Sequence, residues 1–181
     1  HRIRTIDKTG KVSTLAGSGT AGFVDGAASS AGFYSPYDVA VAAGGAVYVA
    51  DLNNKRIRRI LGGIVSTVAG TGVSAVVDGP AKSAAFGNPF SLAMLPNGDL
   101  VIGDLSPGRR LRLLSGGVVS TLAGSGDSGS VDGFGAAATF VEPTGLGVGP
   151  AGHIYVADGG SHRIRRVLNP KKYCGDGQPC T

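Results

Sequence analysis

Several residue types are scarce in this chain. Its 181 residues include no tryptophan, one methionine, one glutamate, two cysteines and three histidines. No run of 18 apolar residues is present, so the sequence predicts no membrane span. So few histidines and cysteines leave little from which to build a metal site. Glycine is abundant, with 32 residues, and together with regular apolar alternation this predicts many short strands and turns.

A repeat of 53 to 54 residues organises the sequence. The segment 12–17 (Val-Ser-Thr-Leu-Ala-Gly) returns in close copies at 65–70 and 119–124. A second segment, 47–60, is an apolar alternation that ends in Asp and is followed by an arginine-rich strand. It returns around 100–112 and 154–165, and residues 1–4 are a partial copy. A fixed period of this length indicates a repeat architecture such as a solenoid or propeller.

Each repeat contains four stretches with the period-2 alternation of a β-strand. In the second unit they lie at about 91–95, 99–104, 110–114 and 118–123, and Asn97-Gly98 is a hairpin turn between the first two. Four antiparallel strands form a propeller blade, which needs neighbouring blades to cover both faces. The sequence therefore predicts an all-β fold, a β-propeller of four-stranded antiparallel blades.

A connection of roughly 18 residues, too long for a plain turn, leads from each blade to the next. It contains an Asp-Gly step, then a Phe and a Pro. We expect the Asp to cap one or two helical turns, the Phe to lie beneath the segment, and Pro36 to begin the inner strand. The equivalent residues are Asp25, Asp78 and Asp132, and Phe33, Phe86 and Phe140.

These motifs resemble the NHL-repeat family. The resemblance rests on Pro-x-x-apolar-Ala-apolar, on Tyr-Val-Ala-Asp at 48–51 and on Asn-x-x-Arg-Ile at 53–57, in a variant with a long connection. It covers about residues 1–168 and implies a β-propeller, most often six-bladed. Repeats two and three depart from it after Asp104 and Asp158. Relatives bind proteins or RNA, act as sensor ectodomains or catalyse a lyase reaction, so the resemblance implies no single function.

The repeats do not add up to a closed ring. Residues 1–168 contain repeats at about 1–54, 55–108 and 109–161 and a partial repeat at 162–168. In blade terms, this is about 3.5 blades, whereas propellers need about four to eight. The sequence predicts a propeller segment that is incomplete on its own. Its partners are expected to be proteins: the same chain's missing blades, another subunit or an assembly partner.

Two glycine motifs match G-x-G-x-x-G, at 17–22 and 124–129. A dinucleotide-binding fingerprint requires a βαβ unit with a long helix. Here the motif recurs in a β array, and its middle copy carries Ala75 in place of the third glycine. We interpret the glycines as structural, and no cofactor is expected.

Most of the basic residues lie in the third strand of the repeat. Their repetition suggests that one arginine per blade pairs with the aspartate that ends the preceding strand, which would fix the turn. The expected pairs are Asp51 with Arg56, Asp104 with Arg110, and Asp158 with Arg163. The alternative is a basic ring that binds phosphate or an acidic partner. No aromatic residues alternate with these arginines, and like charges spread around a propeller form no single patch, so nucleic acid is not expected as a partner.

No catalytic set of residues is recognisable in this segment. The lyase relatives hold zinc with several histidines at the central channel. Here His1 and His162 occupy equivalent positions in different repeats and His153 lies in a hairpin turn, so three ligands do not converge. We expect no catalytic residues and no metal ligands in this segment.

The tail, residues 169–181, abandons the blade pattern and reads as a linker to a next module. Cys174 and Cys180 stand there without a nearby histidine, which indicates a small disulfide loop, with two free thiols as the alternative. A disulfide favours an extracellular or secreted location. The sequence as a whole predicts a non-catalytic protein-interaction or structural module, a scaffold within a larger assembly. The alternatives are a lyase whose metal site lies in missing blades, and an RNA-binding module.

Overall fold

The computed structural model describes residues 1–168, which consist mainly of strands. Residues 169–181, with the predicted Cys174–Cys180 loop, lie outside the described part. Within residues 1–168 there are three short 3-10 helices: η1 (Leu52–Asn54), η2 (Gly135–Ala137) and η3 (Gly159–Ser161). None of the helices in this part of the chain is long and apolar enough to cross a membrane.

Two central sheets confirm the predicted four-stranded antiparallel unit. The strands follow one another in chain order, so that the first strand of each unit lies at one edge. The first sheet consists of β4 (Pro36–Val41), β5 (Val47–Asp51), β6 (Arg56–Leu61) and β7 (Ile64–Ala69), and the second of β9 (Asn88–Met94), β10 (Leu100–Leu105), β11 (Arg110–Ser115) and β12 (Val118–Ala123). As expected, Pro36 begins β4.

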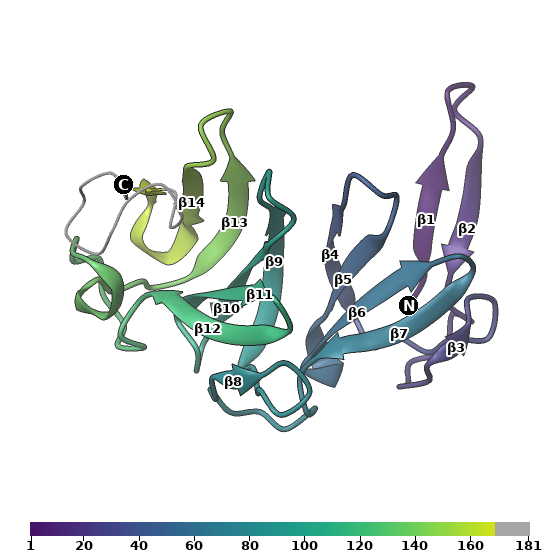
Figure 1. The fold of residues 1–181 in the computed structure, drawn as a ribbon, viewed down its shortest axis with the longest axis horizontal. Coiled ribbons are helices and arrows are strands. Elements are labelled where there is room, and N and C mark those ends of the chain that lie inside the picture. Colours follow the sequence, from purple (N-terminus) through teal and green to yellow (C-terminus); the bar gives the residue numbers. More distant parts are fainter. Residues whose placement is uncertain (169–181) are drawn as a thin grey trace.

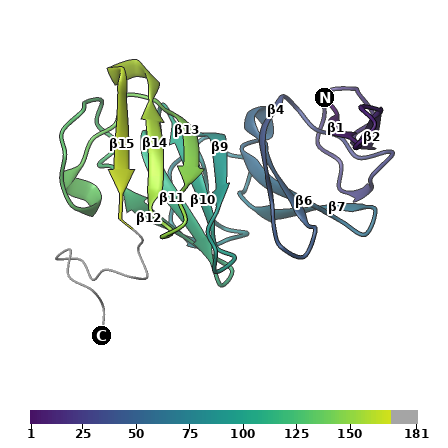
Figure 2. The ribbon, with the colours of Figure 1, turned by 90° about the horizontal axis from the view of Figure 1, so that it is seen from above.

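A smaller sheet flanks the central pair on each side. At the N-terminal side, β1 (Ile3–Ile6) pairs with β2 (Val12–Ala16). At the C-terminal side, β13 (Pro143–Val148), β14 (Ile154–Asp158) and β15 (Arg163–Val167) form a three-stranded sheet. The four sheets follow each other in chain order, and the first and last lie at opposite ends of the row (Figures 1 and 2).

The connections differ from the prediction. In place of a helical turn after Asp25, residues Gly26–Ala27 form a short strand, β3, which pairs with β7. Likewise β8 (Gly79–Pro80) pairs with β12, so each central sheet gains a fifth strand. The fourth strand of a blade has an outer edge of unpaired backbone groups, and this short strand satisfies some of them. The prediction that Asp25 and Asp78 cap a helical turn was therefore wrong. A single turn begins only after the short strand, where the amide of Ala31 donates to the carbonyl of Ala27 and that of Ala84 to the carbonyl of Pro80; η2 is the corresponding turn of the third connection.

Three apolar clusters lie between successive sheets. Each contains the phenylalanine of the long connection, which is completely or almost completely buried: Phe33 in the first, Phe86 in the second and Phe140 in the third. The prediction that these rings lie beneath the connections is confirmed. Because each ring packs between two sheets, the end of the long connection contributes to the core.

The outer faces of the two end sheets expose residues that the central sheets bury. Ile57 in β6 and Leu111 in β11 are fully buried, yet Ile164 at the same position in β15 is 75% exposed. At the other end, Ile6 is 72% exposed, whereas Ile60 at the same position is buried. The apolar pattern of these two faces is therefore that of a blade interface.

Candidate functional site

A buried arginine joins each sheet to the long connection. Arg58 is fully buried, and its guanidinium contacts the carboxylates of Asp51 at 2.8 Å and Asp25 at 2.6 Å. It also donates to the carbonyls of Gly32 and Val24, both at 2.9 Å. Asp25 is thus an acceptor for a side chain rather than a helix cap. The prediction that Asp51 pairs with Arg56 was wrong, because its partner is Arg58, two residues later.

The same arrangement recurs in the other two sheets. One arginine, fully buried at Arg112 and partly buried at Arg165, again binds the Asp that ends the second strand and the Asp of the connection. The distances are 2.5 and 3.3 Å for Arg112 with Asp78 and Asp104, and 2.5 and 3.6 Å for Arg165 with Asp132 and Asp158. The predicted pairs of Asp104 with Arg110 and of Asp158 with Arg163 were therefore wrong by the same two residues.

The arginine that had been expected to pair with Asp51 has a different role. Arg56 donates to the carbonyls of Asn54 at 3.0 Å and Thr71 at 2.6 Å, and its guanidinium lies 3.9 Å from the centroid of the Phe23 ring. Arg110 binds the equivalent carbonyl of Ser125. This arginine fastens the start of the third strand to the loop that follows the fourth.

These contacts explain the glycine motifs. At Gly70, φ is +99° and a Cβ atom would lie 2.5 Å from the carbonyl oxygen of Lys55. At Gly72, φ is +90° and a Cβ atom would lie 2.2 Å from the guanidinium of Arg56. The third glycine differs between the two motifs: a Cβ atom at Gly22 meets nothing within 4 Å, whereas one at Gly129 would lie 2.7 Å from the Thr139 hydroxyl oxygen. These contacts support the structural interpretation of the motif.

The two carboxylates of each network differ in protonation behaviour. Burial acts to raise the pKa of Asp25, but the hydrogen bond from the Thr67 amide and the contacts with Arg58 outweigh it and lower the pKa. Asp78 has a lowered pKa for the same reasons. Burial dominates at Asp51 and raises its pKa despite its hydrogen bonds. Only the carboxylates with a lowered pKa, Asp25 and Asp78, stabilise the fold more as pH rises.

We expect acid to remove the contribution of Asp25. Its pKa in the folded state is below the ordinary 3.8, so its stabilising effect is fully present above that value and is lost as pH falls further. The free energy of unfolding of Asp25→Asn should therefore vary less with pH below about 4 than that of the wild-type protein. Urea unfolding across this range tests it. An unchanged slope in Asp25→Asn would contradict the assignment.

A belt of polar contacts crosses the sheets at the turns between second and third strands; we call this the turn face. At the first junction the backbone amide of Ser35 donates to Nδ1 of His1 at 3.0 Å, and the side-chain amide of Asn53 donates to the Ser35 hydroxyl at 3.1 Å. At the next junction, Lys55 donates to Oδ1 of Asn88. Ser35 and Asn88 occupy equivalent positions, so each basic residue reaches the first strand of the following sheet.

The basic position of this belt has the same backbone conformation in three turns. It holds a non-glycine residue with positive φ: 54° at Lys55, 44° at Arg109 and 56° at His162. Such a conformation is uncommon for these residues and concentrates at functional sites. His1 occupies the same position of the repeat. A basic side chain therefore recurs at the same place in all four repeats.

Two aromatic rings lie beside this belt. Tyr37 in β4 and Phe90 in β9 have ring centroids 3.6 Å apart with an interplanar angle of 35°. Both lie at the start of the first strand of their sheet, two residues after Ser35 and Asn88 respectively. Phe90 is partly buried, whereas Tyr37 is 59% exposed. An exposed aromatic residue in ring contact with its neighbour is a feature that sequence reasoning missed.

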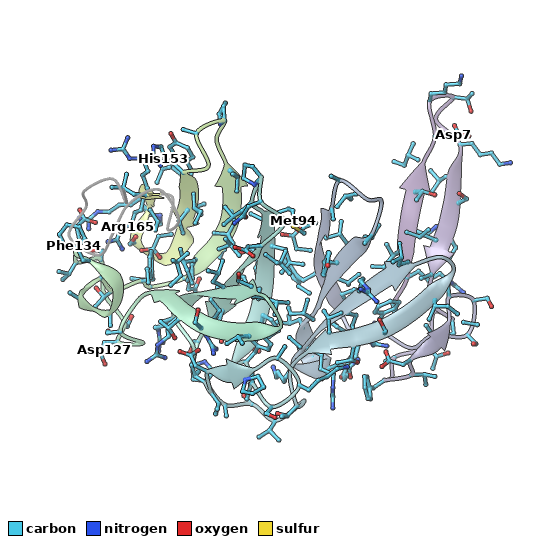
Figure 3. All side chains as sticks on the ribbon, in the orientation of Figure 1. Asp7, Met94, Asp127, Phe134, His153 and Arg165 are labelled. Carbon is cyan, nitrogen blue, oxygen red and sulfur yellow. The ribbon has the colours of Figure 1, made fainter. Side chains whose placement is uncertain are left out.

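The three histidines lie as the sequence predicted. His153 lies in the hairpin between β13 and β14, away from Arg165 (Figure 3). His1 and His162 belong to the equivalent turns of the first and last sheets. Residues 1–168 contain no group of three or more His, Cys, Asp or Glu side chains that could hold a metal ion.

Comparison with known proteins identifies the repeat. The NHL repeat family matches residues 33–60 and 140–167. Protein SUPPRESSOR OF QUENCHING 1, chloroplastic, from Arabidopsis thaliana is 44% identical over 61 residues, which is 33% of this chain and 6% of that protein. The chain thus spans a small part of this relative's length.

Solved structures share the fold at low identity. A protein of unknown function from Bacteroides thetaiotaomicron superposes with a TM-score of 0.75 at 24% identity, over 88% of this chain and 40% of that one. An auxiliary nutrient binding protein from the same organism gives a TM-score of 0.70 at 22% identity, over 91% and 42%. This chain spans about two fifths of the length of each. The sheets described above are blades of a β-propeller, in which residues 33–60 and 140–167 match the NHL repeat.

Proposed function

We propose that this chain is a non-catalytic module that binds a partner protein through its turn face. The observation that carries the proposal is the recurring basic side chain at the same left-handed turn position, in Lys55, Arg109 and His162. Loops held by a rigid scaffold are where binding residues concentrate. The turns here are held rigidly, because a buried arginine network lies beneath each of them.

The buried networks themselves are assigned to stability. Arg58 and Arg112 are fully buried, and their hydrogen-bonding groups are satisfied by carboxylates and carbonyls of the same chain. A partner cannot reach them without unfolding the connection. Binding energy must therefore come from the outer residues of the turn face, which include the exposed Asn53 and Ser106.

Site-specific photo-cross-linking tests this assignment. A photoreactive amino acid at Asn53 lies on the turn face, and one at Asn97 lies in the hairpin at the opposite end of a blade; both positions are exposed. In cells of the source organism, we expect the probe at Asn53 to form a covalent adduct with a partner protein and the probe at Asn97 to form none. Adducts of equal yield at both sites, or at Asn97 alone, would reject the turn face.

The alternatives give different results with the same protein. A lyase with metal ligands in further blades predicts bound zinc in protein purified from its source, measured by elemental analysis. An RNA-binding module predicts affinity for single-stranded RNA that falls steeply with salt.

A further inference from the structure

The structure carries the proposed function one step further, to the chemistry of the partner. We propose that the junction of the β4–β7 and β9–β12 sheets on the turn face binds an acidic peptide segment with an aromatic side chain next to its carboxylate. This inference rests on the proposed function. It is drawn from two cations in successive turns, Lys55 and Arg109, that form no ion pair among residues 1–168, and from the exposed ring of Tyr37 at the start of β4.

The first cation is Lys55. Its ammonium group donates to the amide oxygen of Asn88, a neutral acceptor, and it forms no ion pair within 4.0 Å among residues 1–168. The charge of Asp104 acts on Lys55 and opposes the effect of burial on its pKa, but this carboxylate already accepts from Arg112 and from the backbone amides of Gly87 and Asn88. Burial lowers the pKa of Lys55, so the charged form is held at a cost that an incoming carboxylate would reduce.

The second cation is Arg109, at the corresponding position of the next turn. Its Nε atom is buried and has no hydrogen-bond partner. A buried donor without an acceptor is uncommon and costs free energy. The two turns are linked through Asn88, which accepts from Lys55 and donates to the carbonyl of Ser106 in the Arg109 turn. A carboxylate is the acceptor that suits both groups, since guanidinium and ammonium each bind it with charge-assisted hydrogen bonds.

The ring pair supplies the apolar half of the site. One side of Tyr37 is in contact with Phe90, and much of the residue remains exposed at the start of β4. Phe90 follows Asn88 by two residues, so the rings lie at the same strand ends as the Lys55–Asn88 contact. Aromatic side chains prefer offset or edge contacts with another ring, which favours an aromatic residue in the partner.

Three blocked peptides test the proposal: acetyl-Gly-Glu-Phe-Gly-amide, its Gln-for-Glu form and its Ala-for-Phe form. Binding is measured by NMR titration of the full chain at constant ionic strength. We expect the Glu-Phe peptide to bind at least about tenfold more tightly than either other form, since loss of a charge-assisted bond or of a ring contact is worth about 1.4 kcal/mol or more.

Variants locate the site. Lys55→Gln, Arg109→Gln and Tyr37→Leu should each weaken the Glu-Phe peptide by about fivefold or more. Arg59→Gln is the matched control, because Arg59 also has a buried Nε without a partner but lies on β6, the third strand of its sheet. Thermal melts verify that each variant is folded. If Lys55→Gln or Arg109→Gln does not fold, the affinity of Tyr37→Leu for the Glu-Phe peptide tests the proposal.

Equal affinity for the Glu and Gln peptides, or equal weakening by Arg59→Gln, would overturn the inference. Single-stranded RNA that binds more tightly than the Glu-Phe peptide, and loses affinity in Lys55→Gln and Arg109→Gln, would replace it by a nucleic-acid site. If the peptides fail but cross-linking at Asn53 succeeds, only the partner chemistry is rejected. If both fail, the proposed function falls as well.

Discussion

Replacing Arg58 with methionine is expected to lower the free energy of unfolding by about 3–5 kcal/mol, because it leaves a buried carboxylate without its cation. Asp51 is fully buried and would keep only the amide of Tyr34 and the side chain of Asn54 as donors. The Val24 and Gly32 carbonyls would each lose one of their two donors and keep only a backbone amide. Urea unfolding followed by circular dichroism measures the loss.

Arg56→Met is the matched control for this experiment. It removes two hydrogen bonds to carbonyls and the contact with Phe23, but it leaves no buried charge without a partner. A cost of about 1–3 kcal/mol is expected. If Arg56→Met destabilised the protein more than Arg58→Met, Asp51 would depend on the arginine that the sequence suggested and not on the one in the structure.

Replacing Gly70 with alanine is expected to cost about 3 kcal/mol or more. The positive φ of 99° is strained for alanine, and the added Cβ would lie 2.5 Å from a backbone oxygen that cannot move aside as a flexible side chain could. Thermal unfolding of the variant should show a lower midpoint.

Two further glycines separate the contributions. Gly62 has a φ of +56° and open space, so Gly62→Ala measures the backbone conformation alone, about 1–2 kcal/mol. Gly22 has neither constraint, and Gly22→Ala should change the free energy of unfolding by less than about 0.5 kcal/mol. An equal cost at Gly62 and Gly70 would mean that the close approach to Lys55 has no energetic effect.

The strands were predictable because their signals are local. Apolar alternation with period 2 defined all four strands of the second unit to within a few residues, and Asn97-Gly98 marked the hairpin. The buried position of the phenylalanines followed from their recurrence beside an apolar core. None of these inferences needed to know which side chains meet across space.

The partners of the arginines were not predictable in this way. Residues 56 and 58 are two apart and lie on the same face of β6, so the repeat pattern cannot tell which of them reaches Asp51. The choice depends on Asp25, which comes from the preceding connection. Asp25 was interpreted as a helix cap because Asp-Gly is a turn signal. The segment instead pairs with the free edge of β7, and that edge cannot be recognised from the sequence.

The turn face left a signal that could have been used. A basic residue stands at the same place in every repeat, as His1, Lys55, Arg109 and His162. The repeat is not visible when arginines alone are considered, because two of these four residues are histidines and one is a lysine. The ring contact between Tyr37 and Phe90 had no such signal, since the equivalent residue in the third unit is Thr144.

The arginine networks also bear on how the chain reaches its folded state. Each joins a connection to the third strand of the sheet that follows, at a separation of only 33 or 34 residues. Loops of this length close at modest entropic cost. Blade formation can therefore proceed stepwise along the chain, each completed connection providing the carboxylate that the next sheet requires. A propeller segment of this kind is expected to fold by propagation from one repeat to its neighbour rather than in a single collapse.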